Sequence, residues 1–127
     1  MKKSLDIAAI VLTSLLLLGF ALLSLRGLFD PQQASVRFGA PVTDAAGALF
    51  YRVYLSRNLA IAIAGAVFLL SRQWRPLAIL VSVTAALPVF DMSVLAISGV
   101  TPPLFHPVAL VVIGVTAALL WRRARAV

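Results

Sequence analysis

Three side chains that could do chemistry lie in or beside strongly apolar stretches of this sequence. Arg57 and Asp91 each interrupt an apolar run, and His106 stands at the start of another run, directly before Pro107. A charge at membrane depth costs about 2.5–3.5 kcal/mol on insertion scales, so it persists where it is paired or faces a cavity. Residues of these types could bind an anion, form an ion pair or transfer protons.

Four apolar segments carry these residues and must position them. A helix needs roughly 20 residues to cross a bilayer, within a range of about 17 to 25. The expected spans cover about residues 7–28, 48–70, 76–97 and 106–121, and the last of these is short. The sequence therefore predicts an all-α fold, a single transmembrane domain over residues 1–127 that forms an up-down-up-down four-helix bundle.

Composition supports a membrane protein over a soluble one. The chain has 127 residues, of which 62% are hydrophobic and 12% charged, whereas a soluble domain is about half apolar and a quarter charged. The net charge of +7 lies mostly beside apolar runs, and no basic face or motif indicates nucleic-acid binding. The absence of cysteine excludes disulfides, thiolate metal sites and thiol catalysis.

Basic residues predict the topology. Lysine and arginine gather before the first span, between the second and third, and after the fourth: Lys2, Lys3, Arg72, Arg75, Arg122, Arg123 and Arg125. The positive-inside rule then places both termini in the cytoplasm. Trp74 and Trp121 fall at the same boundary, where aromatic rings favour the headgroup zone. We expect a multi-pass protein of the cell inner (plasma) membrane.

Arg57 and Asp91 lie at similar depths in consecutive antiparallel spans. At 1.5 Å per residue they are roughly 20 Å and 22 Å from the cytoplasmic boundary, so an ion pair between them is plausible. The face of the second span that holds Arg57 also holds Phe50, Tyr54, Ala60 and Ala64. Small residues mark helix–helix contacts in membranes, and this pattern predicts that Arg57 points into the bundle.

The third span has features of a cavity wall. Asp91 shares a helical face with Thr84 and Ser98, each seven residues away, which gives a polar strip. Pro88 lies one turn before Asp91 and removes a backbone hydrogen bond. Such irregular backbone is tolerated at membrane depth where it is buried in protein or lines a cavity.

The outer ends of the spans hold further polar groups. Arg26 could pair with Asp30 four residues later, Arg52 is expected to snorkel outward, and His106 is expected to be an interfacial donor. We expect a polar loop over residues 30–47, because Asp30 precedes a proline that ends the first helix. Thr43 or Asp44 could cap the second helix.

Two interpretations of this outer layer stay open. In the first, Arg57 and Asp91 form a buried ion pair that fixes helix register, and the other groups are interface anchors. In the second, the layer is a polar pocket in the outer leaflet that binds a ligand. A proton or ion pathway is a weaker alternative, because no titratable group continues toward the cytoplasm.

Several short motifs resemble a known family. They are Phe38-Gly39-Ala40-Pro41, Tyr51 with Arg57-Asn58 and Gly65, Pro88 with Asp91, and His106. Together they resemble small bacterial four-span membrane proteins of an uncharacterised domain-of-unknown-function family, broadly DoxX-like, over about residues 27–120. The resemblance implies a four-helix membrane fold with Arg57, Asp91 and His106 as signature positions. Ser56 and Asn58 depart from the family pattern, which often has glycine and aspartate there.

Three functions follow as hypotheses. The chain could bind an anionic amphiphile or lipid, since arginines outnumber aspartates in the outer layer. Alternatively it could be a small membrane enzyme that does acid–base chemistry on a lipophilic substrate. It could also be an accessory subunit or homo-oligomer that docks a helix at Gly114 and Ala118. The partners would then be membrane lipid, a small amphiphilic ligand or another membrane protein, and not nucleic acid.

The residues assigned to these roles are few. The expected ligand-binding residues are Arg26, Tyr54, Arg57, Asn58, Asp91 and His106. Asp91 and His106 are the candidates for catalysis, although nothing else in the sequence indicates an enzyme. No metal site is expected from one histidine and scattered aspartates. We expect no cofactor, because no phosphate-binding glycine loop is present.

Overall fold

The computed structural model describes residues 2–126, with the side chain of Lys2 excepted, and every regular element in that range is a helix. The helices are α1 (Lys2–Phe29), α2 (Pro31–Phe38), α3 (Ala45–Leu70), α4 (Trp74–Thr84), α5 (Ala86–Ile97) and α6 (Phe105–Ala124). Four stretches are long and apolar enough to cross a membrane: Lys3–Phe29, Ala45–Leu70, Trp74–Ile97 and Phe105–Ala124. The predicted all-α fold with four spans is therefore confirmed.

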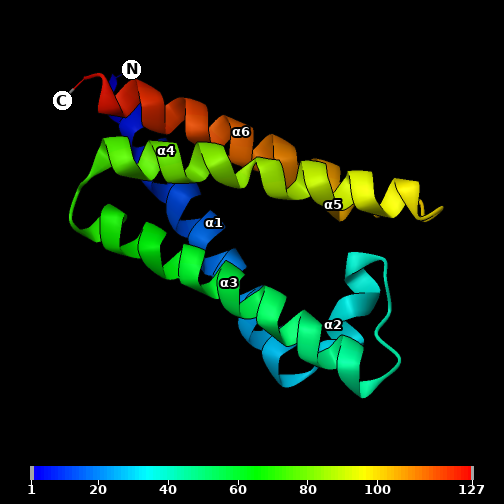
Figure 1. The fold of residues 1–127 in the computed structure, drawn as a ribbon. Coiled ribbons are helices and arrows are strands. Elements are labelled where there is room, and N and C mark those ends of the chain that lie inside the picture. Colours follow the sequence, from blue (N-terminus) through cyan, green and yellow to red (C-terminus); the bar gives the residue numbers. More distant parts are fainter. Residues whose placement is uncertain (1, 127) are drawn as a thin grey trace.

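The third span contains the local irregularity that its proline predicts. α4 ends at Thr84 and α5 begins at Ala86, because Pro88 has no N–H to donate to the carbonyl one turn earlier. Ala85 between them keeps helical angles, with φ −62° and ψ −23°. The two helices therefore continue in nearly the same direction and act as one span (Figure 1).

The helices pack mainly as two pairs, α1 with α3 and α4 with α6. Buried apolar side chains of α4 and α6 form the largest core cluster: Leu77, Ala78, Val81, Ile113, Ala117 and Leu120. α1 and α3 approach closely at small residues, since a Cβ on Gly65 would meet Leu17 and one on Gly27 would meet Leu55. Small residues permit this close packing between membrane helices.

The two helix pairs form a wedge. They lie together at the end that holds both termini and the turn between α3 and α4, and they separate toward the end that holds α2 (Figure 1). We call these the narrow end and the wide end. At the narrow end the Asp6 carboxylate joins α1 to α6 through Arg122 at 2.8 Å and Arg123 at 3.5 Å.

The wide end contains a helix where the sequence interpretation placed a loop. Asp30 caps α2 by accepting the Gln33 backbone N–H at 3.1 Å, and Pro31 occupies the first turn. Gly39 ends the helix with φ 101°, a left-handed conformation that glycine adopts without strain. The expected loop over residues 30–47 is therefore wrong for Pro31–Phe38, because aspartate, proline and glycine at these positions specify a short helix, whereas residues 39–44 are non-helical as expected.

The remaining connection to α3 is also tied down. The buried Ser35 hydroxyl accepts a hydrogen bond from the Val42 backbone N–H at 2.9 Å. Asp44, one of the two caps expected for the second span, accepts the Gly47 N–H at 2.6 Å. These bonds hold α2 across the opening between the helix pairs.

Candidate functional site

A cavity of about 530 Å³ lies at the wide end of the wedge. Side chains from α1, α2, α3, α5 and α6, with one residue of the loop before α6, converge on it. The polar lining residues are Ser24, Arg26, Gln33, Arg37, Tyr51, Tyr54, Asn58, Asp91 and His106. The volume falls in the range of about 300–1,000 Å³ typical of small-molecule sites.

The cavity has a cationic rim and a largely apolar wall. Arg26 and Arg37 line it and are also exposed, which places their guanidinium groups at its edge. The Arg26 Nη2 donates a hydrogen bond to Gln33 Oε1 at 2.9 Å, so α1 and α2 are linked at the rim. Phe20 and Leu23 line the cavity from α1, nearer the membrane centre than Arg26.

Asp91 and His106 meet inside the cavity. His106 Nδ1 lies 3.8 Å from Asp91 Oδ2, and the two side chains are 2% and 22% exposed. The other ring nitrogen, Nε2, makes a 3.0 Å hydrogen bond with the Phe38 carbonyl oxygen. His106 therefore connects α6 to α5 and to the C-terminal end of α2.

These contacts determine where protons can reside on the pair. A carbonyl oxygen only accepts hydrogen bonds, so His106 Nε2 must carry its proton toward Phe38. If the ring is otherwise neutral, Nδ1 presents a lone pair toward Asp91. Nδ1 is then the ring atom that faces the Asp91 carboxylate, and Asp91 is the more exposed member of the pair.

An aromatic cluster surrounds the pair. The Phe38 ring lies 6.3 Å from Tyr51, 5.8 Å from Tyr54 and 5.2 Å from His106, between ring centroids. Tyr54, Asn58 and Asp91 line the same cavity. The cluster supplies hydroxyl and carboxyl groups that could bind the polar part of a ligand.

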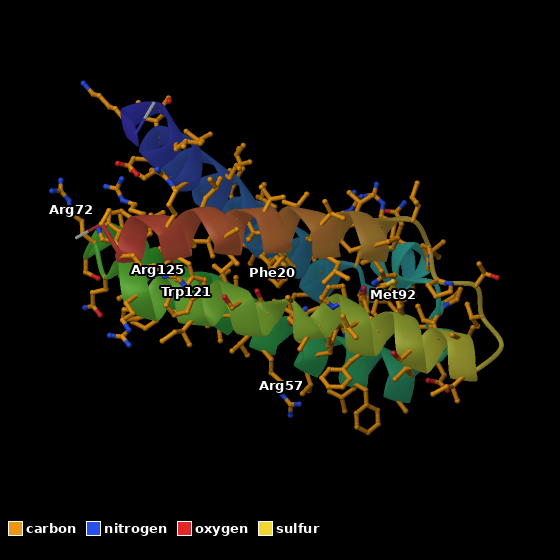
Figure 2. All side chains as sticks on the ribbon, turned by 90° about the horizontal axis from the view of Figure 1, so that it is seen from above. Phe20, Arg57, Arg72, Met92, Trp121 and Arg125 are labelled. Carbon is orange, nitrogen blue, oxygen red and sulfur yellow. The ribbon has the colours of Figure 1, made fainter. Side chains whose placement is uncertain are left out.

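Arg57 does not belong to this site. Its side chain is exposed and points away from the bundle (Figure 2), and the cavity lining does not include it. The predicted ion pair between Arg57 and Asp91 is therefore wrong. The buried face of α3 contains Ala48, Leu55 and Ala62. It lies on a different side of the helix from Ala60 and Ala64, which were expected to pack.

Other expected contacts at the wide end are replaced. Asp30 does not pair with Arg26, because its carboxylate caps α2 while Arg26 bonds to Gln33. Arg52 is exposed as expected, but its Nε donates to the Leu28 carbonyl at 3.0 Å and so caps the end of α1. His106 is a donor at the start of α6, as expected, but it is 1% exposed and donates within the protein, to the Phe38 carbonyl.

The third span borders the cavity at Asp91 and Pro88, as expected, but the rest of the expected polar strip does not line it. The Thr84 and Ser98 hydroxyls donate to carbonyls of their own helices, Val81 at 2.8 Å and Val94 at 2.8 Å. Only Asp91 of the strip lines the cavity, together with Leu87 and Pro88. A serine or threonine in a membrane helix commonly satisfies its hydroxyl in this local way.

The structure brings five of the six expected ligand-binding residues together: Arg26, Tyr54, Asn58, Asp91 and His106. It adds residues that the sequence interpretation did not assign to the site, above all Gln33, Arg37 and Phe38 of α2. Recognition of the capping signals at Asp30, Pro31 and Gly39 would have placed that helix beside the cavity. Among residues 2–126 no group of histidine or carboxylate side chains could hold a metal ion.

Comparison with known proteins gives one match. The model of a family described as a domain of unknown function (DUF4267) matches residues 18–120, a range that includes all the cavity-lining residues. No curated protein and no solved structure matches the chain.

Proposed function

The chain belongs to the family of the domain of unknown function DUF4267, and from this premise we propose that it binds an amphiphile with an anionic head. The observation that carries the proposal is the division of the cavity into two zones. Arg26 and Arg37 stand at its exposed rim, whereas apolar side chains line the part nearer the membrane centre. A ligand with a charged head and a hydrocarbon body matches this division.

Distances along the helices support this orientation. From Arg26 to Phe20 the cavity lining descends α1 by roughly 9 Å, at 1.5 Å per residue. From His106 to Ile113 it descends α6 by roughly 10 Å on the same basis. These lengths accommodate a head group and the first part of a chain, and the rest of the ligand would continue into the bilayer.

Charge supports an anionic rather than a cationic head. Arg26 and Arg37 are the charged groups at the rim, and Asp30 nearby is used as a helix cap. Asp91 lies deeper and faces His106, so it does not stand at the rim. Guanidinium groups bind carboxylate and phosphate in paired hydrogen bonds.

The orientation of the bundle belongs to the same proposal. We place the narrow end, which holds the basic cluster and both termini, at the cytoplasmic face of a bacterial inner membrane, as the positive-inside rule favours. The cavity would then open toward the outer leaflet. An amphiphile could reach it from that leaflet.

Native mass spectrometry of protein titrated with oleate, or with uncharged oleyl alcohol, tests the proposal. We expect oleate to bind more tightly than the alcohol to the wild type. The double variant Arg26→Gln/Arg37→Gln should bind oleate roughly a hundredfold more weakly, since a hydrogen bond to a charged group contributes about 1.5 kcal/mol or more.

Arg57→Gln is the matched control, because it removes an exposed arginine that does not line the cavity. Oleate affinity should be unchanged in this variant. Equal binding of acid and alcohol, or unchanged oleate binding by the double variant, would refute the proposal. Circular dichroism of each variant confirms that helix content is retained.

A second candidate function rests on the Asp91–His106 pair. The two side chains face each other between α5 and α6 beside a cavity suited to a lipophilic molecule, which is an arrangement compatible with acid–base chemistry. In that case Asp91 would exchange protons with the ligand and His106 would position and charge it. Recovery of the titrated ligand with an altered mass would favour this enzyme over a binding protein.

A further inference from the structure

Arg57 places a cation within a membrane span, and no side chain among residues 3–126 forms an ion pair with it. Its side chain is exposed and points outward from α3 (Figure 2). Within residues 2–126 it has no hydrogen bond, ion pair or aromatic contact. A charge at this depth is costly unless it is paired, so the structure as a monomer leaves this cost uncompensated.

The position of Arg57 along α3 limits what could compensate it. The residue is roughly 18 Å from Ala45 and 20 Å from Leu70, at 1.5 Å per residue. A depth of roughly 20 Å from the cytoplasmic boundary leaves roughly 10 Å to the outer headgroup layer in a hydrocarbon core about 30 Å thick. A group at the same depth can contact the guanidinium directly, whereas a lipid phosphate has to be reached along the membrane normal.

A second copy of the chain does not supply that group. The chain has four acidic residues, and each has another role. Asp6 pairs with arginines at the narrow end, Asp30 and Asp44 cap helices, and Asp91 faces His106. Two copies that met at this face would bring their guanidinium groups together, which is repulsive in a low-dielectric environment.

We propose that the exposed face of α3 around Arg57 docks a transmembrane helix of another protein that carries a carboxylate at mid-membrane depth. The face is suited to such contact. Ala60 lies nearly one turn from Arg57 and is exposed, so a partner backbone can approach closely there. Val53 and Ser56 complete the exposed surface beside the guanidinium.

The test uses synthetic transmembrane peptides of alternating leucine and alanine with either glutamate or glutamine at the centre. The protein is reconstituted in phosphatidylcholine vesicles, and association is measured by energy transfer from a dye on Ser71→Cys, since the chain has no cysteine of its own. We expect the glutamate peptide to associate at least tenfold more strongly than the glutamine peptide. This preference should vanish in Arg57→Gln.

Charge reversal makes the test specific. The Arg57→Glu variant should no longer associate with the glutamate peptide, and it should associate with a matching peptide that has lysine at its centre. Arg52→Gln is the matched control, because Arg52 is exposed on the same helix but bonded to the Leu28 carbonyl, and it should keep the wild-type preference.

Three results would overturn the proposal. One is equal association of both peptides, and another is a glutamate preference that survives Arg57→Gln. The third is complete displacement of the peptide by phosphatidylglycerol, which would assign Arg57 to a lipid phosphate. None of these variants alters a cavity-lining residue, so the outcome is independent of the proposed amphiphile binding.

Discussion

At the scale of single residues, Asp91 and His106 couple three helices. His106 contacts Asp91 of α5 and the last residue of α2, Phe38, through its two ring nitrogens. A change at either member of the pair therefore affects more than a local contact. The buried imidazole also leaves the more exposed carboxyl group as the part of the pair that a ligand would touch.

This coupling can be measured. We expect Asp91→Asn and His106→Gln each to destabilise the protein, and the double variant to lose less stability than the sum of the two. The interaction free energy should be about 1 kcal/mol or more, as is usual for residues in one polar network. Unfolding in mixed micelles gives the three differences in the free energy of unfolding, and strict additivity would contradict a direct interaction between Asp91 and His106.

Much of the residue content of the site follows from sequence, because polar groups in apolar spans are rare and costly. That reasoning identified Tyr54, Asp91 and His106. It failed for Arg57 because periodicity groups residues by face but does not say which face is buried. Ala48, Leu55 and Ala62 recur at the same spacing of seven, and only packing against α1 distinguishes their seam from the face of Arg57.

At the scale of elements, α2 determines the shape of the wide end. Gly39 ends it with φ 101°, and an added Cβ would lie 2.9 Å from Pro103 Cδ. Gly99 also has a positive φ, of 75°, but nothing lies within 4 Å of its Cβ position. Substitution of both glycines therefore distinguishes the cost of backbone strain, which both share, from the cost of a steric contact, which only Gly39 has.

We expect Gly39→Ala to destabilise the protein by about 2 kcal/mol or more, and Gly99→Ala by about 1 kcal/mol, the cost of a left-handed conformation in a residue with a side chain. The additional cost at Gly39 comes from the contact with Pro103. Melting temperatures of the two variants in one detergent check the order. Equal decreases in melting temperature would show that the loop before α6, which contains Pro103, moves away from the added methyl group without cost.

The four long apolar helices overlap the four segments predicted from hydropathy, because apolar runs and turn residues mark where such helices lie. The break before α5 was predictable from Pro88 in the same way. α2 was not predicted, because the residue before a proline avoids helical angles and Pro31 therefore indicated only the end of α1. At Pro31 proline is instead in the first turn of a helix, where its missing N–H costs nothing.

At the scale of the whole molecule, the proposed orientation predicts which end is accessible from each side of the membrane. Ser71 lies in the turn at the narrow end and Thr101 in the loop at the wide end, and both are exposed. In spheroplasts, Thr101→Cys should react with an impermeant maleimide at once. Ser71→Cys should react only after permeabilisation.

The wild type is a clean control because it contains no cysteine. Labelling of Ser71→Cys in intact spheroplasts, with Thr101→Cys protected, would show that the bundle is inverted. The cavity would then open toward the cytoplasmic leaflet, and the supply of its ligand would have to be reconsidered.

The separation of the helix pairs toward the α2 end (Figure 1) also has a mechanical side. A body with a larger cross-section in one leaflet than in the other displaces unequal amounts of lipid from the two monolayers. Bending the bilayer so that the more crowded monolayer expands relieves this imbalance. The elastic state of the surrounding membrane thus contributes to the free energy of the folded protein, and regions of matching curvature accommodate it at the lowest cost.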